Sequence, residues 1–197
     1  MQDHQFLRTL PSKRIQDVSV LGLWLIPIPS VLKPITIEEN ELAAKLHPNR
    51  EKQYRYSRGY ARHVLAELSG RKPLDIPLQA IPGKPPELAK DWGYISFSYC
   101  KNALIIGWSP KKIGIDIEIS ERDFNANQLV KRYFCKKEKK ELANVNSESL
   151  RIKVLTKWVV KEAAIKWQKG GIYTDLRYWE IDGENNTAKH QLKNNVV

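Results

Sequence analysis

The chain has 197 residues, of which 42% are apolar and six are Trp, so it can bury a core as one large domain or two small ones. Its formal charge of +11 indicates an anionic partner, which can be nucleic acid, a membrane surface, a phosphorylated ligand or an acidic protein. The two cysteines form no CxxC pair, which argues against a disulfide framework or a zinc site. We expect a cytoplasmic protein with reduced thiols.

The first part of the chain is expected to contain one strand and two helices. Residues 18–28 are an apolar run that ends in prolines; the run is too short to span a bilayer and lacks the flanks of a signal peptide, so it predicts a strand. Helices are predicted over 36–46 and 49–68, the second ended by Ser69-Gly70. Repeated prolines in 72–87 exclude a long regular element there.

The second part of the chain is strand-like first and helical later. Segments rich in β-branched and aromatic residues predict a meander of three strands, at 94–99, 103–108 and 113–119. Three helices are then expected, at 127–134, 136–143 and 150–169, the last stopped by Gly170-Gly171. A last strand at 177–181 precedes a polar tail from Gly183 that we expect to be frayed. This order favours an α+β fold of two similar halves that meet near residue 110.

The segment 113–119 alternates isoleucine with other residues. Isoleucines at period two predict one buried face, which places Asp116 and Glu118 together on the other face. Neighbours on one face of a strand are roughly 7 Å apart at Cα, so both carboxylates can reach one hard divalent ion such as Mg²⁺. Gly114 leaves room beside them for a ligand. A strand whose polar face is simply solvated shows the same alternation, so the motif is weak alone.

A second group of polar residues lies on the helix predicted over 150–169. Trp158, Glu162 and Lys166 follow at i, i+4 and i+8, so they share one side of this helix. An adjacent apolar stripe consists of Leu155, Val159 and Ala163. One stripe can be buried while the other faces a site. A surface ion pair between Glu162 and Lys166 is the alternative, which Trp158 on the same side disfavours.

The two segments together resemble the paired signature of the phosphopantetheinyl transferase superfamily, in its surfactin-synthetase-activating type. The family pattern is G-[V/I]-D-x-E followed by an aromatic residue and K-E-[A/S]-x-x-K, and residues 114–118 and 158–166 fill every fixed position. Between them, 133–138 with Leu142 resembles the family linker F-F-S-x-x-E-x-x-x-L. Gly170-Gly171 resembles the glycines that follow its long helix.

The resemblance continues upstream and spans roughly residues 50 to 180. Gly83-Lys84-Pro85 matches the family's G-K-P loop. Ser98-Tyr99 stands where the family usually has Ser-His, and Tyr99 can donate a hydrogen bond in place of the histidine.

The resemblance implies a fold and an activity. The fold would consist of two similar α/β-type halves in a pseudo-twofold arrangement, with the active site in the cleft between them. Residues 1–109 would bind the adenosine and 3′-phosphate of coenzyme A, and residues 110–197 would carry the metal site and the catalytic helix. The enzyme would move phosphopantetheine from coenzyme A to a serine of an acyl or peptidyl carrier protein and release 3′,5′-ADP. Fatty acid, polyketide or nonribosomal peptide synthesis would be served by this reaction.

The resemblance also assigns catalytic roles. Mg²⁺ would be held by Asp116, Glu118 and Glu162. Glu162 would act as general base for the serine, and Lys166 would stabilise or protonate the departing phosphate.

Contacts to coenzyme A are expected from both halves. Arg55, Arg58 and Arg62 lie at i, i+3 and i+7 of a helix that resembles the family's Arg-rich helix, although a solvated basic face would look the same. The residues expected to contact coenzyme A are Arg55, Arg62, Lys84, Pro85, Ser98, Tyr99, Asp116 and Lys166. Acidic carrier proteins would dock on a basic cluster that consists of Lys131, Arg132, Lys136, Lys137, Lys139 and Lys140.

Two other functions would explain part of the sequence. The charge and the Arg- and Tyr-containing segment near residue 55 suit a basic nucleic-acid-binding protein, and the carboxylates suit a metal-dependent nuclease. A nucleic-acid-binding function leaves the paired motifs unexplained. We therefore expect a transferase, without nucleic-acid or membrane partners, that acts as a monomer.

Overall fold

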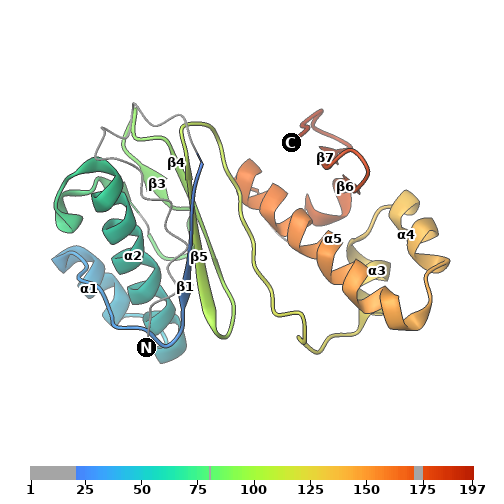
Figure 1. The fold of residues 1–197 in the computed structure, drawn as a ribbon, viewed down its shortest axis with the longest axis horizontal. Coiled ribbons are helices and arrows are strands. Elements are labelled where there is room, and N and C mark those ends of the chain that lie inside the picture. The colour runs from blue at the N-terminus through green and yellow to red at the C-terminus, as the bar shows by residue number, and fades with distance from the viewer. Residues whose placement is uncertain (1–20, 80, 171–174) are drawn as a thin grey trace. The chain divides into compact units, whose positions relative to one another are not determined.

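The computed structural model describes residues 21–79, 81–170 and 175–197. The chain divides into two compact units, Met1–Ile113 and Gly114–Val197. Figure 1 shows helices and small antiparallel sheets in each unit, and this mixture confirms the α+β class. The predicted halves divide a few residues earlier, after 109, and the roles given to them stay predictions. Among the described residues, no helix has the length and apolar character needed to cross a bilayer.

The described residues of the first unit form a three-stranded sheet, a two-stranded hairpin and two α-helices. Its strands are β1 (Gly22–Pro27), β2 (Leu78–Gln79), β3 (Glu87–Leu88), β4 (Tyr94–Tyr99) and β5 (Ala103–Ser109). Its helices are α1 (Ile37–Ala44), α2 (Pro48–Ser69) and the 3₁₀ turn η2 (Pro73–Asp75). The strand order β1-β5-β4 is antiparallel throughout, and Trp24 pairs with Ile106 across β1 and β5.

The core of the first unit lies between this sheet and α2, which covers one face of the sheet in Figure 1. Trp24, Ile106 and Trp108 from the strands pack with Val64 and Leu65 of α2. Alternation along β1 places Leu23 and Leu25 on the opposite face, where about half of each side chain is exposed.

The helix boundaries in this unit follow from local sequence signals. Thr36 caps α1 and forms a capping box with Glu39, which accepts from the Thr36 N–H at 3.0 Å. Pro48 begins α2, and Gly70 ends it with a φ of +67°, a left-handed conformation that costs glycine least because it has no Cβ. Both predicted helices are therefore confirmed. Within the described part of 72–87, which excludes residue 80, the regular elements are short: η2, β2 and the start of β3.

The second unit is built around one long helix. Its elements are α3 (Ala126–Tyr133), α4 (Lys136–Ala143), α5 (Ser147–Gln168), the 3₁₀ turn η3 (Leu176–Tyr178), β6 (Trp179–Asp182) and β7 (Thr187–His190). The core consists of α5 residues such as Trp158 and Ile165, packed with Phe134 from the α3–α4 connection and Trp179 from β6. The Trp158 ring meets the Tyr133 ring edge-on, with centroids 5.3 Å apart.

Two predictions for this unit were wrong. Residues 113–119 are extended, but they belong to none of the described sheets, and each isoleucine among them is only partly buried, so the isoleucines form no separate buried face. The tail is not frayed, because β6 and β7 form an antiparallel hairpin and Val197 exchanges backbone hydrogen bonds with Ala188. The helix predicted over 150–169 is confirmed as α5: it ends at Gln168, Lys169 adopts the left-handed conformation and Gly170 N donates to Ile165 O at 3.1 Å, while Gly171 lies outside the described residues.

Candidate active site

The segment that carries Asp116 lies against α5, the helix that carries Glu162 and Lys166. Lys166 Nζ lies 2.6 Å from Asp116 Oδ1, an ion pair between residues 50 positions apart in the sequence. The Asp116 side chain is almost fully buried, with 3% exposed, whereas 27% of the Lys166 side chain is exposed. The segment that carries the aspartate is therefore held beside the helix that carries the lysine.

Gly114 explains how this extended segment approaches the helix so closely. A Cβ added at this position would overlap Ala163 O and Trp167 N of the α5 backbone. The expectation that Gly114 leaves room for a ligand was therefore wrong, because the space beside it is filled by the helix. Its small size sets the approach that brings Asp116 to Lys166.

Glu162 lies one turn before Lys166 and belongs to the same electrostatic cluster. Burial raises the pKa of Glu162 to about 7, and the negative charge of Asp116 adds to this effect. Lys166 opposes the shift, and Glu118 reinforces it more weakly. The mutual influence of Asp116, Glu118 and Glu162 shows that all three predicted metal ligands share one neighbourhood.

Glu118 is paired with a residue that the motif did not include. Arg122 Nη1 donates to Glu118 Oε1. Burial nevertheless raises the pKa of the Glu118 carboxyl, against the effect of Arg122, and Asp116 raises it further. Arg122 lies in a turn outside any helix, so no periodicity in the sequence connects it to Glu118.

The chemistry of these side chains fits a hard divalent cation, since Mg²⁺ prefers carboxylate oxygens together with phosphate and water. In the positions shown, no three His, Cys, Asp or Glu side chains within 21–79, 81–170 and 175–197 converge as a ligand set. Two of the three carboxylates face cations instead, Asp116 facing Lys166 and Glu118 facing Arg122. Coordination of Mg²⁺ by all three would require rearrangement of these pairs.

A buried ion pair supports α5 from the other side. Lys161, which precedes Glu162, is fully buried with Nζ 2.8 Å from a carboxylate oxygen of Glu138, which is also fully buried. Lys161 also donates to Trp179 O, and Glu138 accepts from Ile181 N at 3.2 Å. The pair therefore joins α4, α5 and β6 and fixes the rotation of α5 about its own axis.

The buried stripe of α5 differs from the predicted one. Trp158 is in the core together with Val154, Lys161 and Ile165, while Val159 and Ala163 are only half-buried. Trp158 was predicted on the site side of the helix, and the structure assigns it to the core instead. Glu162 and Lys166, both half-buried, flank the buried stripe.

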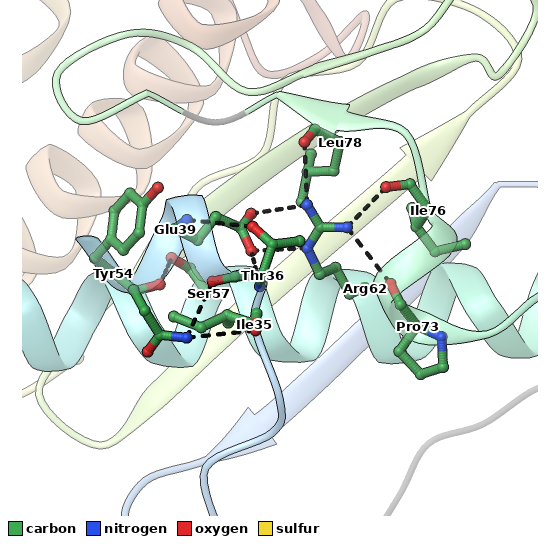
Figure 2. Close-up of polar contacts among 10 residues, drawn as sticks. Ile35, Thr36, Glu39, Tyr54, Ser57, Arg62, Pro73, Ile76 and Leu78 are labelled. Carbon is green, nitrogen blue, oxygen red and sulfur yellow. Dashed lines mark hydrogen bonds and ion pairs between the residues drawn. The ribbon is translucent and has the colours of Figure 1, made fainter. Parts of the chain in front are cut away.

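In the first unit, Arg62 has a different environment from the one predicted. Figure 2 shows its guanidinium between Glu39 and three backbone carbonyl groups. Arg62 Nε and Nη2 donate to the two Glu39 oxygens at 2.8 and 3.0 Å, and the side chain is only 4% exposed. It also donates to the carbonyl groups of Pro73, Ile76 and Leu78. Because Arg62 ties α1, α2 and η2 together from a buried position, its placement argues for a structural role and against phosphate contact.

The other basic residues expected to contact phosphate are more accessible. Arg55 on α2 pairs with Glu51 at 2.8 Å, with 26% of its side chain exposed, and it also donates to Asn40. Lys84 and Pro85 are exposed in the turn between β2 and β3, where Lys84 N donates to Ile81 O at 3.1 Å. Arg58 stacks on the Tyr54 ring, 4.0 Å from its centroid.

Ser98 and Tyr99 are neighbours on β4 and therefore point to opposite faces of the sheet. Tyr99 packs against the core side, and burial raises the pKa of its phenol. Ser98 is buried on the other face. The structure does not bring these two predicted contacts together on one surface.

Aspartate and glutamate side chains beside a lysine suit the binding of a divalent cation together with phosphate groups. Residues 112–194 match the family model described as the 4′-phosphopantetheinyl transferase superfamily. The matched range contains Asp116, Glu118, Glu162 and Lys166, so this similarity supports that superfamily and phosphopantetheinyl transfer as the general activity. No curated protein matches the chain.

Proposed function

We propose that this protein transfers 4′-phosphopantetheine from coenzyme A to a serine of an acyl or peptidyl carrier protein, as an enzyme of the surfactin-synthetase-activating type. The observation that carries the proposal is the ion pair of Lys166 with Asp116, which brings two distant motif segments into one site. The family match over the same residues is independent support.

Each side chain in the site has a chemical role in the proposed reaction. The serine oxygen forms a bond to the phosphorus next to pantetheine, and the bond from that phosphorus to 3′,5′-ADP breaks. Glu162 lies one turn before Lys166 and is suited to accept the serine proton. Lys166 is suited to stabilise the charge on the departing phosphate.

Asp116, Glu118 and Glu162 would hold Mg²⁺, which supplies charge neutralisation for the diphosphate when it is bound. The remaining task of the protein is to align the serine with the phosphorus. The position of α5, set by Gly114 and by the Lys161–Glu138 pair, determines where Glu162 and Lys166 lie. The site thus depends on packing as much as on its reactive groups.

In the first unit, Arg55, Lys84 and Pro85 stay our proposed contacts to coenzyme A, because their side chains are at least partly exposed. Arg62 is excluded from this set by its buried pairing with Glu39. The pseudo-twofold relation of the halves, the monomeric state and the identity of the carrier protein stay predictions.

A ligand-binding experiment distinguishes the transferase from the two alternatives. The thermal midpoint of the protein with Mg²⁺ is measured with coenzyme A, with 3′,5′-ADP and with a short DNA duplex. Coenzyme A at about 100 times its dissociation constant stabilises the folded state by about 2.7 kcal/mol, which is readily detected. A midpoint raised by DNA and unaffected by coenzyme A would favour a nuclease or a nucleic-acid-binding protein.

A further inference from the structure

Arg122 has no role in the family signature, yet it contacts a predicted metal ligand. Its guanidinium donates to Glu118 from the turn that follows the carboxylate segment. Arg122 therefore belongs to the site although sequence reasoning missed it.

The backbone of this turn is fixed independently of the Arg122 side chain. Arg122 N donates to Ile119 O at 3.0 Å, and Arg151 of α5 donates to Ser120 O and, at 3.4 Å, to Arg122 O. The Arg122 side chain is 44% exposed, whereas the Glu118 side chain is 18% exposed. The guanidinium can therefore leave Glu118 by side-chain rotation alone, without a change in the chain path.

The charges in the site explain why such a movement is useful. Among these five side chains, the two cations Lys166 and Arg122 face two of the three carboxylates, and their charges sum to one negative charge when all are ionised. A divalent cation bound to these carboxylates gives the site a net positive charge if Arg122 is present. Without Arg122 the same site is neutral, and a diphosphate is attracted less strongly.

We propose that Arg122 exchanges partners during substrate binding: it pairs with Glu118 until a divalent cation takes that carboxylate, and it then binds diphosphate oxygens of coenzyme A. The planar guanidinium suits both partners, because it forms paired hydrogen bonds with carboxylates and with phosphates. This inference rests on the proposed function of the same site. It makes Arg122 a determinant of affinity for the diphosphate and a competitor of the metal.

The test uses Arg122→Gln, Arg122→Lys and the control Arg177→Gln, which removes an exposed arginine elsewhere in the same unit. Mn²⁺ binding to the protein alone is followed by electron paramagnetic resonance, and coenzyme A binding at saturating Mn²⁺ by calorimetry. Arg122→Gln is expected to bind Mn²⁺ several-fold more tightly and coenzyme A about tenfold more weakly, a change of about 1.4 kcal/mol. Arg122→Lys keeps the charge, so its Mn²⁺ affinity stays near that of the wild type while its coenzyme A affinity falls a few-fold.

Opposite changes in the two affinities are the diagnostic result. If both affinities fall together, Arg122 only supports the local structure and the exchange is wrong. If both match the wild type and Arg177→Gln, Arg122 has neither role, while the proposed transferase function stands. If the wild type itself binds neither Mn²⁺ nor coenzyme A, the proposed function fails and this inference fails with it. Because the Arg122 side chain is exposed, its replacement should leave the fold intact. Far-UV circular dichroism checks that each variant is folded.

Discussion

Lys161 Nζ lies 2.8 Å from a Glu138 carboxylate oxygen, and neither side chain is exposed to solvent. Burial lowers the pKa of Lys161, and the charge of Glu138 opposes that shift. Because Glu138 also accepts from Cys135 N and Ile181 N, the pair anchors the start of α4 and the strand β6 to α5. Glu162 follows Lys161 directly, so the position of the proposed base depends on this buried pair.

Removal of the lysine alone should therefore be costly. Lys161→Met leaves Glu138 buried without its countercharge, which is expected to lower the free energy of unfolding by about 3 to 5 kcal/mol. The double variant Lys161→Met/Glu138→Gln should recover much of this loss, because no charge is then buried. Urea denaturation measures both effects. The control is Lys137→Met, which breaks the exposed Lys137–Glu180 pair, also at 2.8 Å, and should cost far less because solvent screens that pair. Equal losses at the two lysines would contradict the anchoring role.

Arg62 is predicted to act on stability and not directly on coenzyme A. Arg62→Lys keeps the charge but cannot reproduce the paired contacts to Glu39 and the backbone carbonyl groups, so about 2 to 4 kcal/mol of stability should be lost. Arg55→Lys, at the exposed pair with Glu51, should cost under about 1 kcal/mol. A stable Arg62→Lys variant with greatly weakened coenzyme A binding would restore the phosphate role that the sequence suggested.

Gly114 is predicted to tolerate no side chain. The methyl group of Gly114→Ala would overlap the α5 backbone, so we expect a loss of about 1 to 3 kcal/mol together with displacement of Asp116 from Lys166. Gly183→Ala is the matched control, because an added Cβ there has no neighbour within 4 Å. Chemical denaturation of both variants measures the difference. Equal stability of the two would mean that the close approach of the 114–118 segment to α5 is wrong.

The raised pKa of Glu162 predicts a pH-dependent stability. Since the folded-state pKa is about 7 and the ordinary value is 4.5, the folded state holds this proton more tightly. The resulting stabilisation is fully present below pH 4.5 and is lost as the pH rises through about 7. Between these limits the wild type should lose stability relative to Glu162→Gln by an amount on the order of 2 kcal/mol, reduced by solvent screening. Urea titrations with chelator from pH 5 to pH 8 measure this difference, and the exposed Glu148→Gln is the control. A constant difference across this range would contradict the burial of Glu162.

Local sequence signals predicted most helices and the sheet of the first unit. The helices predicted over 36–46 and 49–68, the helix stop at Gly70 and the strands predicted over 94–99 and 103–108 depend on short segments of sequence, and the structure confirms them. The alternating segment 113–119 failed as a strand because alternation predicts an extended backbone but does not supply a pairing partner. Contact with a helix replaced that partner.

The β6–β7 hairpin was missed although its turn carries a signal. Asp182 Oδ1 accepts from the N–H groups of Glu184 and Asn185, and Asn186 adopts a φ of +52°, a conformation that asparagine tolerates. The polar composition of this segment predicts a frayed tail, whereas its Asp and Asn residues form a turn. A search for Asp and Asn at turn positions would have found it.

The sequence pointed to the carboxylates of the candidate site and to Lys166. It did not predict the pairs Glu118–Arg122 and Lys161–Glu138. Helical periodicity identified the face of α2 that carries Arg62, yet it could not show that Glu39 of α1 covers that face. Arg122 is paired through a turn, and Glu138 through tertiary packing, neither of which has a period in the sequence. The partners of buried charged side chains could therefore not be predicted from the sequence and are known only from the structure.

The most direct test of the central claim is intact-mass spectrometry of an apo acyl carrier protein after incubation with this protein, coenzyme A and Mg²⁺. Asp116→Asn and Glu162→Gln are run beside the wild type. The proposal predicts that the carrier gains the mass of one phosphopantetheine with the wild type and that both variants are strongly impaired. If several apo carriers gain no mass with a folded wild type and intact coenzyme A, the transferase assignment is contradicted.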